Sequence, residues 1–263
     1  MGTEIQRTGY VWQRPAAILG LLLILTTPAL VWGAAPDLKV TPDLVEIGAW
    51  FRGHRVTVSG MIPKGAEAVM EVVGQTNDEH LMRKGRRGGL WMNVGEIDIH
   101  NAPSLYMVRS SNPKLLEPAA AEAPWGFAAL KRRVTLSGMI SDQEKAEFFD
   151  QFLELKGSEG LYTTFKDPIK KSRAAGDLVP VAGEFRLPTN VKPGTYEVCL
   201  TVIQDGRVSA RTCGELQVKM VGFPAMLTTL AYEHGATYGI LAVVIAIVTG
   251  FAIGFLFKGG GGH

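Results

Sequence analysis

The sequence predicts a mainly β fold, namely an immunoglobulin-like β-sandwich ectodomain with a short helical insertion and a C-terminal transmembrane helix. Three observations predict it. Apolar and polar residues alternate through segments such as 54–60, as in half-buried strands. Turn residues such as Pro63, Lys64 and Gly65 separate these segments. Residues 238–257 carry no charge, and at about 1.5 Å per helical residue they span a bilayer core.

The first 35 residues have the order of a signal peptide. Arg7 and Arg14 precede the apolar run 16–25, and small residues come near the end of the segment. Cleavage near Gly33 or Ala35 is sterically acceptable, and the sequence leaves the choice open. If the signal is cleaved, the mature N-terminus lies outside. If it is retained, the first helix exports the chain after it, so residues 36–237 are exported in both cases.

A first β-region is predicted over residues 36–113. Its end is indicated by Asn112 and Pro113, which favour a turn. A β-sandwich meander would account for the alternation. The expected strands cover residues 44–51, 54–60, 67–73, 90–94, 96–100 and 102–111.

Residues 114–175 are predicted to form a linker and a helical insertion. Apolar residues recur at helical spacing at positions 148, 149, 152 and 155. Ser141 and Glu144 match a capping box at the start of this helix, and Gly157 and Gly160 favour its end.

A second β-region is predicted over residues 176–222, with a hairpin that turns at Asp205 and Gly206. Cys199 and Cys213 are nearly equidistant from that turn, so they lie opposite each other or one position off. A disulfide would close a loop of about 15 residues and stabilise the fold by about 3 kcal/mol. Two buried free thiols are the alternative.

A membrane-proximal helix is predicted over 223–237, followed by the transmembrane helix over 238–257 and a cytoplasmic tail over 258–263. A buried core helix is the alternative for 238–257, but this stretch is apolar on every face. Lys258 comes directly after it, which favours a cytoplasmic C-terminus. Gly250 and Gly254 form a GxxxG pattern that predicts a helix–helix contact or occurs by chance.

The exported part is electrically balanced, because segment 36–237 holds 24 of the 27 basic and 24 of the 25 acidic residues. Nucleic-acid binding needs clustered positive charge, so we expect no nucleic-acid partner. The five histidines, at positions 54, 80, 100, 234 and 263, are widely separated, and no CxxC or G-x-S-x-G pattern is present. We therefore predict no catalytic residues, no metal site and no cofactor, and a protein that is not an enzyme.

A basic, glycine-rich run over residues 82–89 is the main candidate binding segment. It is interpreted as an anion-binding loop formed by Arg83, Lys84, Arg86 and Arg87, because guanidinium groups bind phosphate or anionic lipid headgroups. A solvated loop between strands is the alternative, since no following Lys-Ser or Lys-Thr pair completes a phosphate-binding motif.

Several segments together resemble an uncharacterised family of transmembrane proteins described mainly from alphaproteobacteria (Alph_Pro_TM). They are residues 83–93, 102–111, 160–162, 187–196, 205–206, 221–223 and 238–250. The Ala/Pro piece near 118–124 and the cysteine pair depart from the pattern. The resemblance implies a membrane-anchored topology and an association with a sulfite-exporter-type permease. It implies no catalytic residues.

These observations predict a single-pass protein of the bacterial inner membrane, with its ectodomain in the periplasm. The predicted role is a non-enzymatic accessory module for a protein partner in the membrane or envelope, such as a transporter. A periplasmic small-anion sensor or binding protein is the alternative.

Overall fold

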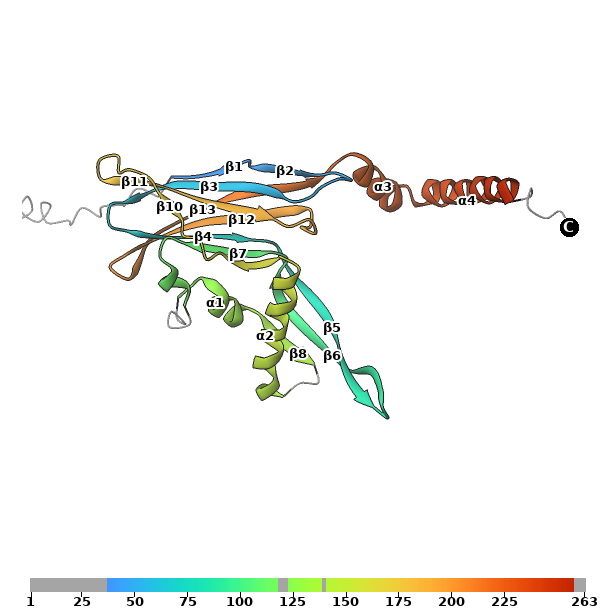
Figure 1. Cartoon of the computed structure of the whole chain (residues 1–263), viewed down its shortest axis with the longest axis horizontal. Coiled ribbons are helices and arrows are strands. Elements are labelled where there is room, and N and C mark those ends of the chain that lie inside the picture. The colour runs from blue at the N-terminus through green and yellow to red at the C-terminus, as the bar shows by residue number, and fades with distance from the viewer. Residues whose placement is uncertain (1–36, 118–122, 139–140, 258–263) are drawn as a thin grey trace, which may run out of the picture. The chain divides into compact units, whose positions relative to one another are not determined.

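The computed structural model of the chain describes residues 37–117, 123–138 and 141–257 (Figure 1). The predicted signal peptide and its cleavage sites, and the predicted cytoplasmic tail, lie outside these residues. Within the described part, three β-sheets and a C-terminal apolar helix confirm the mainly β fold class. The immunoglobulin-like assignment is a finer statement and stays a prediction.

A four-stranded sheet forms one layer of the sandwich. Its two central strands are antiparallel, with Val56 of β3 opposite Phe185 of β11, and both side chains are fully buried. The strand order is β1 (Leu38–Thr41), β3 (His54–Pro63), β11 (Leu178–Leu187) and β10 (Lys170–Lys171).

A six-stranded sheet forms the second layer. Its longest strands, β12 and β13, form a hairpin that turns at Asp205 and Gly206 with φ angles of 50° and 75°. Glycine adopts such positive angles readily, and Asp tolerates them better than most residues. The strand order is β2 (Leu44–Ile47), β13 (Arg207–Met220), β12 (Gly194–Gln204), β4 (Glu67–Val73), β7 (Tyr106–Ser110) and β9 (Tyr162–Thr164).

The core lies between these two sheets. Met70 of β4 lies against Gly183 of β11, and Leu200 of β12 lies against Gly60 of β3. Each of these two sheets combines strands from residues 36–113 with strands from residues 176–222, and each ends with a short strand from residues 114–175. This arrangement is not the meander that local alternation suggested, since the consecutive strands β3 and β4 belong to different sheets.

The helical insertion covers the outer face of the six-stranded sheet (Figure 1). The ring of Tyr106 in β7 lies 6.0 Å from that of Phe127, and the ring of Tyr162 in β9 lies 5.6 Å from that of Phe152. The predicted capping box at Ser141 and Glu144 is present. The helical elements are η2 (Pro113–Leu116), α1 (Gly126–Arg133) and α2 (Asp142–Ser158).

A third sheet contains a long hairpin, which we call the arm, formed by β5 (Thr76–Arg87) and β6 (Leu90–Pro103) (Figure 1). Its third strand is β8 (Thr135–Gly138), which pairs with β6. Residues 83–87 lie in strand β5, so the prediction of a loop there is wrong. The prediction depended on the basic, glycine-rich composition of residues 82–89, but a strand at this largely exposed end of the arm does not need alternating apolar residues.

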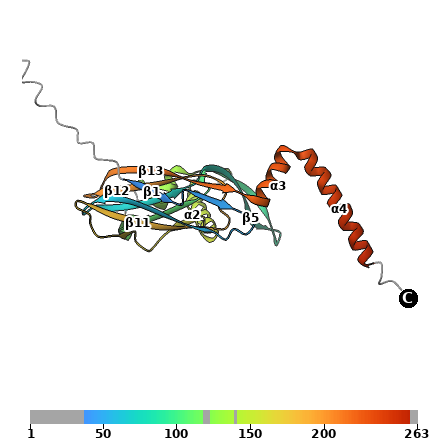
Figure 2. The same ribbon diagram turned by 90° about the horizontal axis from the view of Figure 1, so that it is seen from above.

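Two helices follow the sandwich. Helix α3 (Gly222–Glu233) is capped by His234, and α4 (Gly235–Phe257) begins at the residue after the cap (Figure 2). Helix α4 has no charged residue and no buried residue. Every face of it is therefore apolar and accessible.

Candidate interaction surface

The tip of the arm exposes three consecutive large apolar side chains. Leu90, Trp91 and Met92 are 69%, 73% and 45% accessible. The exposed residues Lys84, Arg86 and Arg87 lie on the opposing strand, where Arg86 pairs with Trp91 and Arg87 with Leu90. We call these six residues the tip patch. Because successive side chains of a strand point to opposite faces, Trp91, Lys84 and Arg86 lie on one face of the tip, and Leu90, Met92 and Arg87 lie on the other. Each face combines apolar area with positive charge.

The four basic residues of the predicted anion site differ in their surroundings. The guanidinium of Arg83 forms an ion pair with Glu144 at 3.1 Å and lies 5.2 Å from the centre of the Phe148 ring. Arg86 donates from Nε to the carbonyl of Gly89 at 3.4 Å. Arg83 is thus engaged by α2, whereas the side chains of Lys84, Arg86 and Arg87 are exposed.

A cavity of about 470 Å³ lies between the arm and α2. Its charged lining is mixed, because Arg83 and Lys84 are accompanied by Glu144 and Glu147. Its apolar lining comprises Leu81, Met82, Ile97, Phe148, Phe152 and Leu155. The cavity therefore offers no net positive charge from these four groups.

Lys156 of α2 forms an ion pair with the base of the arm. Its Nζ donates to Glu79 Oε1 of β5 at 2.6 Å, and its side chain is only 10% exposed. The Lys156 ammonium also lies 5.5 Å from the centre of the Phe152 ring. This partly buried ion pair fixes the arm to the helix that caps the sandwich.

One face of the arm near its base carries two hydrogen-bonded histidines. His80 Nδ1 lies 2.5 Å from Asp98 Oδ1, and His100 Nδ1 lies 2.9 Å from Asp78 Oδ2. The hydrogen bond to Asp98 raises the pKa of His80, and the hydrogen bond from His100 lowers the pKa of Asp78. These histidine–aspartate pairs are not evident from the sequence, because the partners are 18 or 22 residues apart and lie on different strands.

His100 also takes part in a series of hydrogen bonds that connects three residues. His100 Nε2 lies 2.8 Å from Ser137 Oγ, so Asp78, His100 and Ser137 are connected in the order of a catalytic triad. The His100 and Asp78 side chains are 35% and 57% exposed, and none of the three residues lines a cavity described above. The geometry orders a histidine on an exposed face of the arm.

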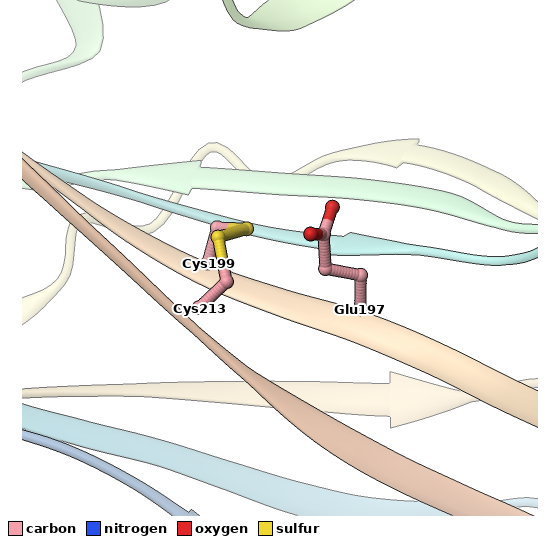
Figure 3. Close-up of side chains that lie close together, drawn as sticks. All are labelled: Glu197, Cys199 and Cys213. Carbon is pink, nitrogen blue, oxygen red and sulfur yellow. A yellow bond between two sulfur atoms is a disulfide. The ribbon is translucent and has the colours of Figure 1, made fainter.

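Cysteines 199 and 213 occupy directly opposite positions of the β12–β13 hairpin and are bonded in the structure, with an S–S distance of 2.09 Å (Figure 3). Glu197 lies beside them on the same strand as Cys199 (Figure 3). Cys199 is buried and Cys213 is exposed. The bond occupies both sulfur atoms, so this trio offers no thiolate for a metal.

Glu71 of β4 is a fully buried charged residue in the six-stranded sheet. It accepts a hydrogen bond of 2.6 Å from the Tyr106 hydroxyl, and the backbone N–H of Gly126 donates to that hydroxyl at 2.7 Å. Arg211 Nη2 lies 3.6 Å from its other oxygen. Burial raises the pKa of Glu71. This network connects the sheet to α1 and is structural.

Gly250 and Gly254 lie on one side of α4, where a groove is lined by Ala246, Ile247, Phe251 and Phe255 as well. Small residues four apart let a second helix approach closely. No described residue outside the helix lines this groove.

Among the described residues, α4 is the one helix that is long and apolar enough to cross a membrane. The family model described as "Putative transmembrane protein (Alph_Pro_TM)" matches residues 37–259. No curated protein matches the chain.

Proposed function

Because the chain belongs to the Alph_Pro_TM family of transmembrane proteins, we propose that it is a membrane-anchored, non-enzymatic interaction protein whose arm binds a protein partner. The observation that carries this proposal is the tip patch, where Trp91 is exposed on one face of the arm and Leu90 and Met92 on the other. Large exposed apolar groups are costly unless a partner covers them. Trp, Met and Arg are also the residue types enriched at the centres of protein interfaces.

The tip patch indicates the chemistry of the partner. Trp91 needs an apolar pocket, and Lys84 and Arg86 on the same face need acidic groups around it. A partner with an apolar pocket rimmed by Asp or Glu fits this surface. A membrane protein such as a transporter would also contact the Gly250 and Gly254 face of α4.

We place the β-rich part in the periplasm and the C-terminus in the cytoplasm of a bacterial inner-membrane protein. The signal-like order of the first 35 residues and Lys258 after the apolar helix support this orientation. The Cys199–Cys213 disulfide is compatible with it, because disulfides persist in oxidising compartments.

The small-anion sensor has less support. Its one favourable observation is that Arg83 and Lys84 both line the cavity beside α2. Against it, Arg83 already forms an ion pair with Glu144, and Glu147 adds a second negative charge to the lining of the cavity. Phosphate or sulfate binding that is unchanged after neutralising Arg83, Lys84, Arg86 and Arg87 would exclude this candidate.

Site-specific photocrosslinking in intact membranes tests the leading proposal. A photoreactive amino acid at position 91 is expected to capture one discrete protein, and charge reversal of Arg86 and Arg87 is expected to reduce the yield. The same amino acid at position 50 is the matched control, because Trp50 is 89% exposed but lies outside the arm. Capture of lipid alone, or equal capture from both positions, would reject the proposal.

A further inference from the structure

The solvent-facing side of the arm brings one imidazole and two carboxylates together. His80 of β5 is opposite Asp98 of β6, and Glu96 is two residues from Asp98 on the same face. One ligand atom from each of the three lies within 4.8 Å of the others. Two ligands of one tetrahedral metal ion lie roughly 3.4 Å apart, so small rotations of exposed side chains bring these atoms into range.

The ligand atoms are available. Among the described residues, the hydrogen bond of the His80 ring is the one from Nδ1 to Asp98, which leaves Nε2 without a hydrogen-bond partner there, and 65% of the side chain is exposed. The Glu96 carboxylate has no hydrogen bond or ion pair with a described residue. His100 differs, because Asp78 and Ser137 occupy both of its ring nitrogens.

The local charge favours a cation. Asp98, Glu96 and Asp78 all act electrostatically on His80. At neutral pH these three carboxylates exceed the charge of a single imidazolium, and the excess attracts a positive ion. The other basic group nearby, His100, is already engaged by Asp78.

The strand that carries Glu96 and Asp98 is buried on its other face and paired on both edges. Ile97 and Ile99, which alternate with the ligand residues on β6, are 2% and 1% exposed and are packed on the opposite face. The third strand β8 also pairs with β6 from Ile97 to His100. Ligands on paired strands with a buried underside keep their spacing better than ligands on a loop.

We propose that His80, Glu96 and Asp98 bind a divalent transition-metal ion. One imidazole nitrogen and two carboxylate oxygens suit an ion such as Zn²⁺, with water in the remaining position. Ca²⁺ prefers six to eight oxygen ligands, and Mg²⁺ retains most of its water, so neither matches this set. The site lies on the arm but does not include the tip patch.

Isothermal titration of the full chain in detergent micelles tests the site with Zn²⁺ as the probe. The protein is purified without a polyhistidine tag, stripped with a chelator and kept oxidised so that both cysteines remain bonded. We expect one Zn²⁺ per chain, with affinity weakened about tenfold or more by His80→Ala and by Asp98→Asn. His54→Ala is the matched control, because His54 is exposed in β3 outside the arm.

Equal Zn²⁺ affinity in His80→Ala and His54→Ala, or no Zn²⁺ binding by the wild-type chain at millimolar concentration, would overturn the proposal. Tighter binding of Mg²⁺ or Ca²⁺ than of Zn²⁺ would overturn the choice of ion. Circular dichroism of each variant separates loss of the site from loss of the fold. Photocrosslinking from position 91 is expected to persist in His80→Ala, so the metal proposal and the partner proposal fail independently.

Discussion

The hydroxyl of Tyr106 donates a 2.6 Å hydrogen bond to the buried carboxylate of Glu71 and accepts one from the backbone N–H of Gly126. A single phenol thus joins strand β4 to the start of α1. Since Tyr106 and Glu71 are both fully buried, neither group exchanges this partner for water.

Replacing Tyr106 with Phe tests the contribution of that hydroxyl. The variant keeps the ring but leaves Glu71 and the Gly126 N–H without their partner, so we expect the free energy of unfolding to fall by about 1–3 kcal/mol. Urea unfolding of the full chain in micelles measures it. The exposed Tyr232→Phe is the control, and equal stability of the two variants would show that the buried network contributes nothing.

The buried carboxylate also gives stability a dependence on pH. Burial raises the pKa of Glu71 above its ordinary value of 4.5, so between the two pKa values the folded state binds more protons than the unfolded state. The contribution of Glu71 is therefore fully present below pH 4.5 and is lost as pH rises through the folded pKa.

Glu71→Gln removes this titrating group, so the difference in unfolding free energy between wild type and variant is expected to shift in favour of the variant as pH rises. Unfolding midpoints of both proteins across the acidic to neutral range measure the difference. A constant difference would mean that Glu71 has the same pKa in both states.

The disulfide permits a prediction about the hairpin. Cys199 and Cys213 are 14 residues apart in sequence, and closing a loop of that size stabilises a fold by about 3 kcal/mol. The Cys199→Ala/Cys213→Ala chain is expected to lose about that amount. A reductant should lower the unfolding midpoint of the wild type and leave the double variant unchanged, and equal responses would contradict the prediction.

Local sequence signals predicted the elements whose partners are near in sequence. The β12–β13 hairpin was identifiable from its Asp205–Gly206 turn, and the start of α2 from Ser141 and Glu144, because a turn or a cap depends on a few consecutive residues. The apolar helix was identifiable from composition alone.

Non-local pairing was not predictable in the same way. Strand β3 pairs with β11, more than 100 residues later, and no local pattern specifies that choice. The face shared by His80, Asp98 and His100 depends on register, and shifts between Asn77 and Glu79 and between Arg83 and Lys84 change which residues align. A one-residue error would place these side chains on opposite faces.

The partly buried ion pair at the base of the arm predicts local mobility when it is broken. Lys156→Met leaves the Glu79 carboxylate without its cation, so we expect a loss of about 1.5–3 kcal/mol. Hydrogen exchange should speed up in β5 and α2 more than in β12. Lys156→Met/Glu79→Gln should recover part of the loss, and no recovery would show that the two residues are not coupled.

The hydrogen-bonded residues Asp78, His100 and Ser137 allow the non-enzymatic proposal to be tested directly. A serine activated by a histidine reacts with a fluorophosphonate, because Oγ attacks phosphorus, fluoride leaves and the histidine accepts the hydroxyl proton. Ser137 lines none of the cavities described above, and a hydrolase also needs donors placed around the developing oxyanion. We therefore expect no fluorophosphonate labelling of the full chain, as judged by intact-mass spectrometry. Labelling that His100→Ala and Ser137→Ala both abolish, and that Ser59→Ala leaves intact, would instead assign nucleophilic catalysis to this face of the arm.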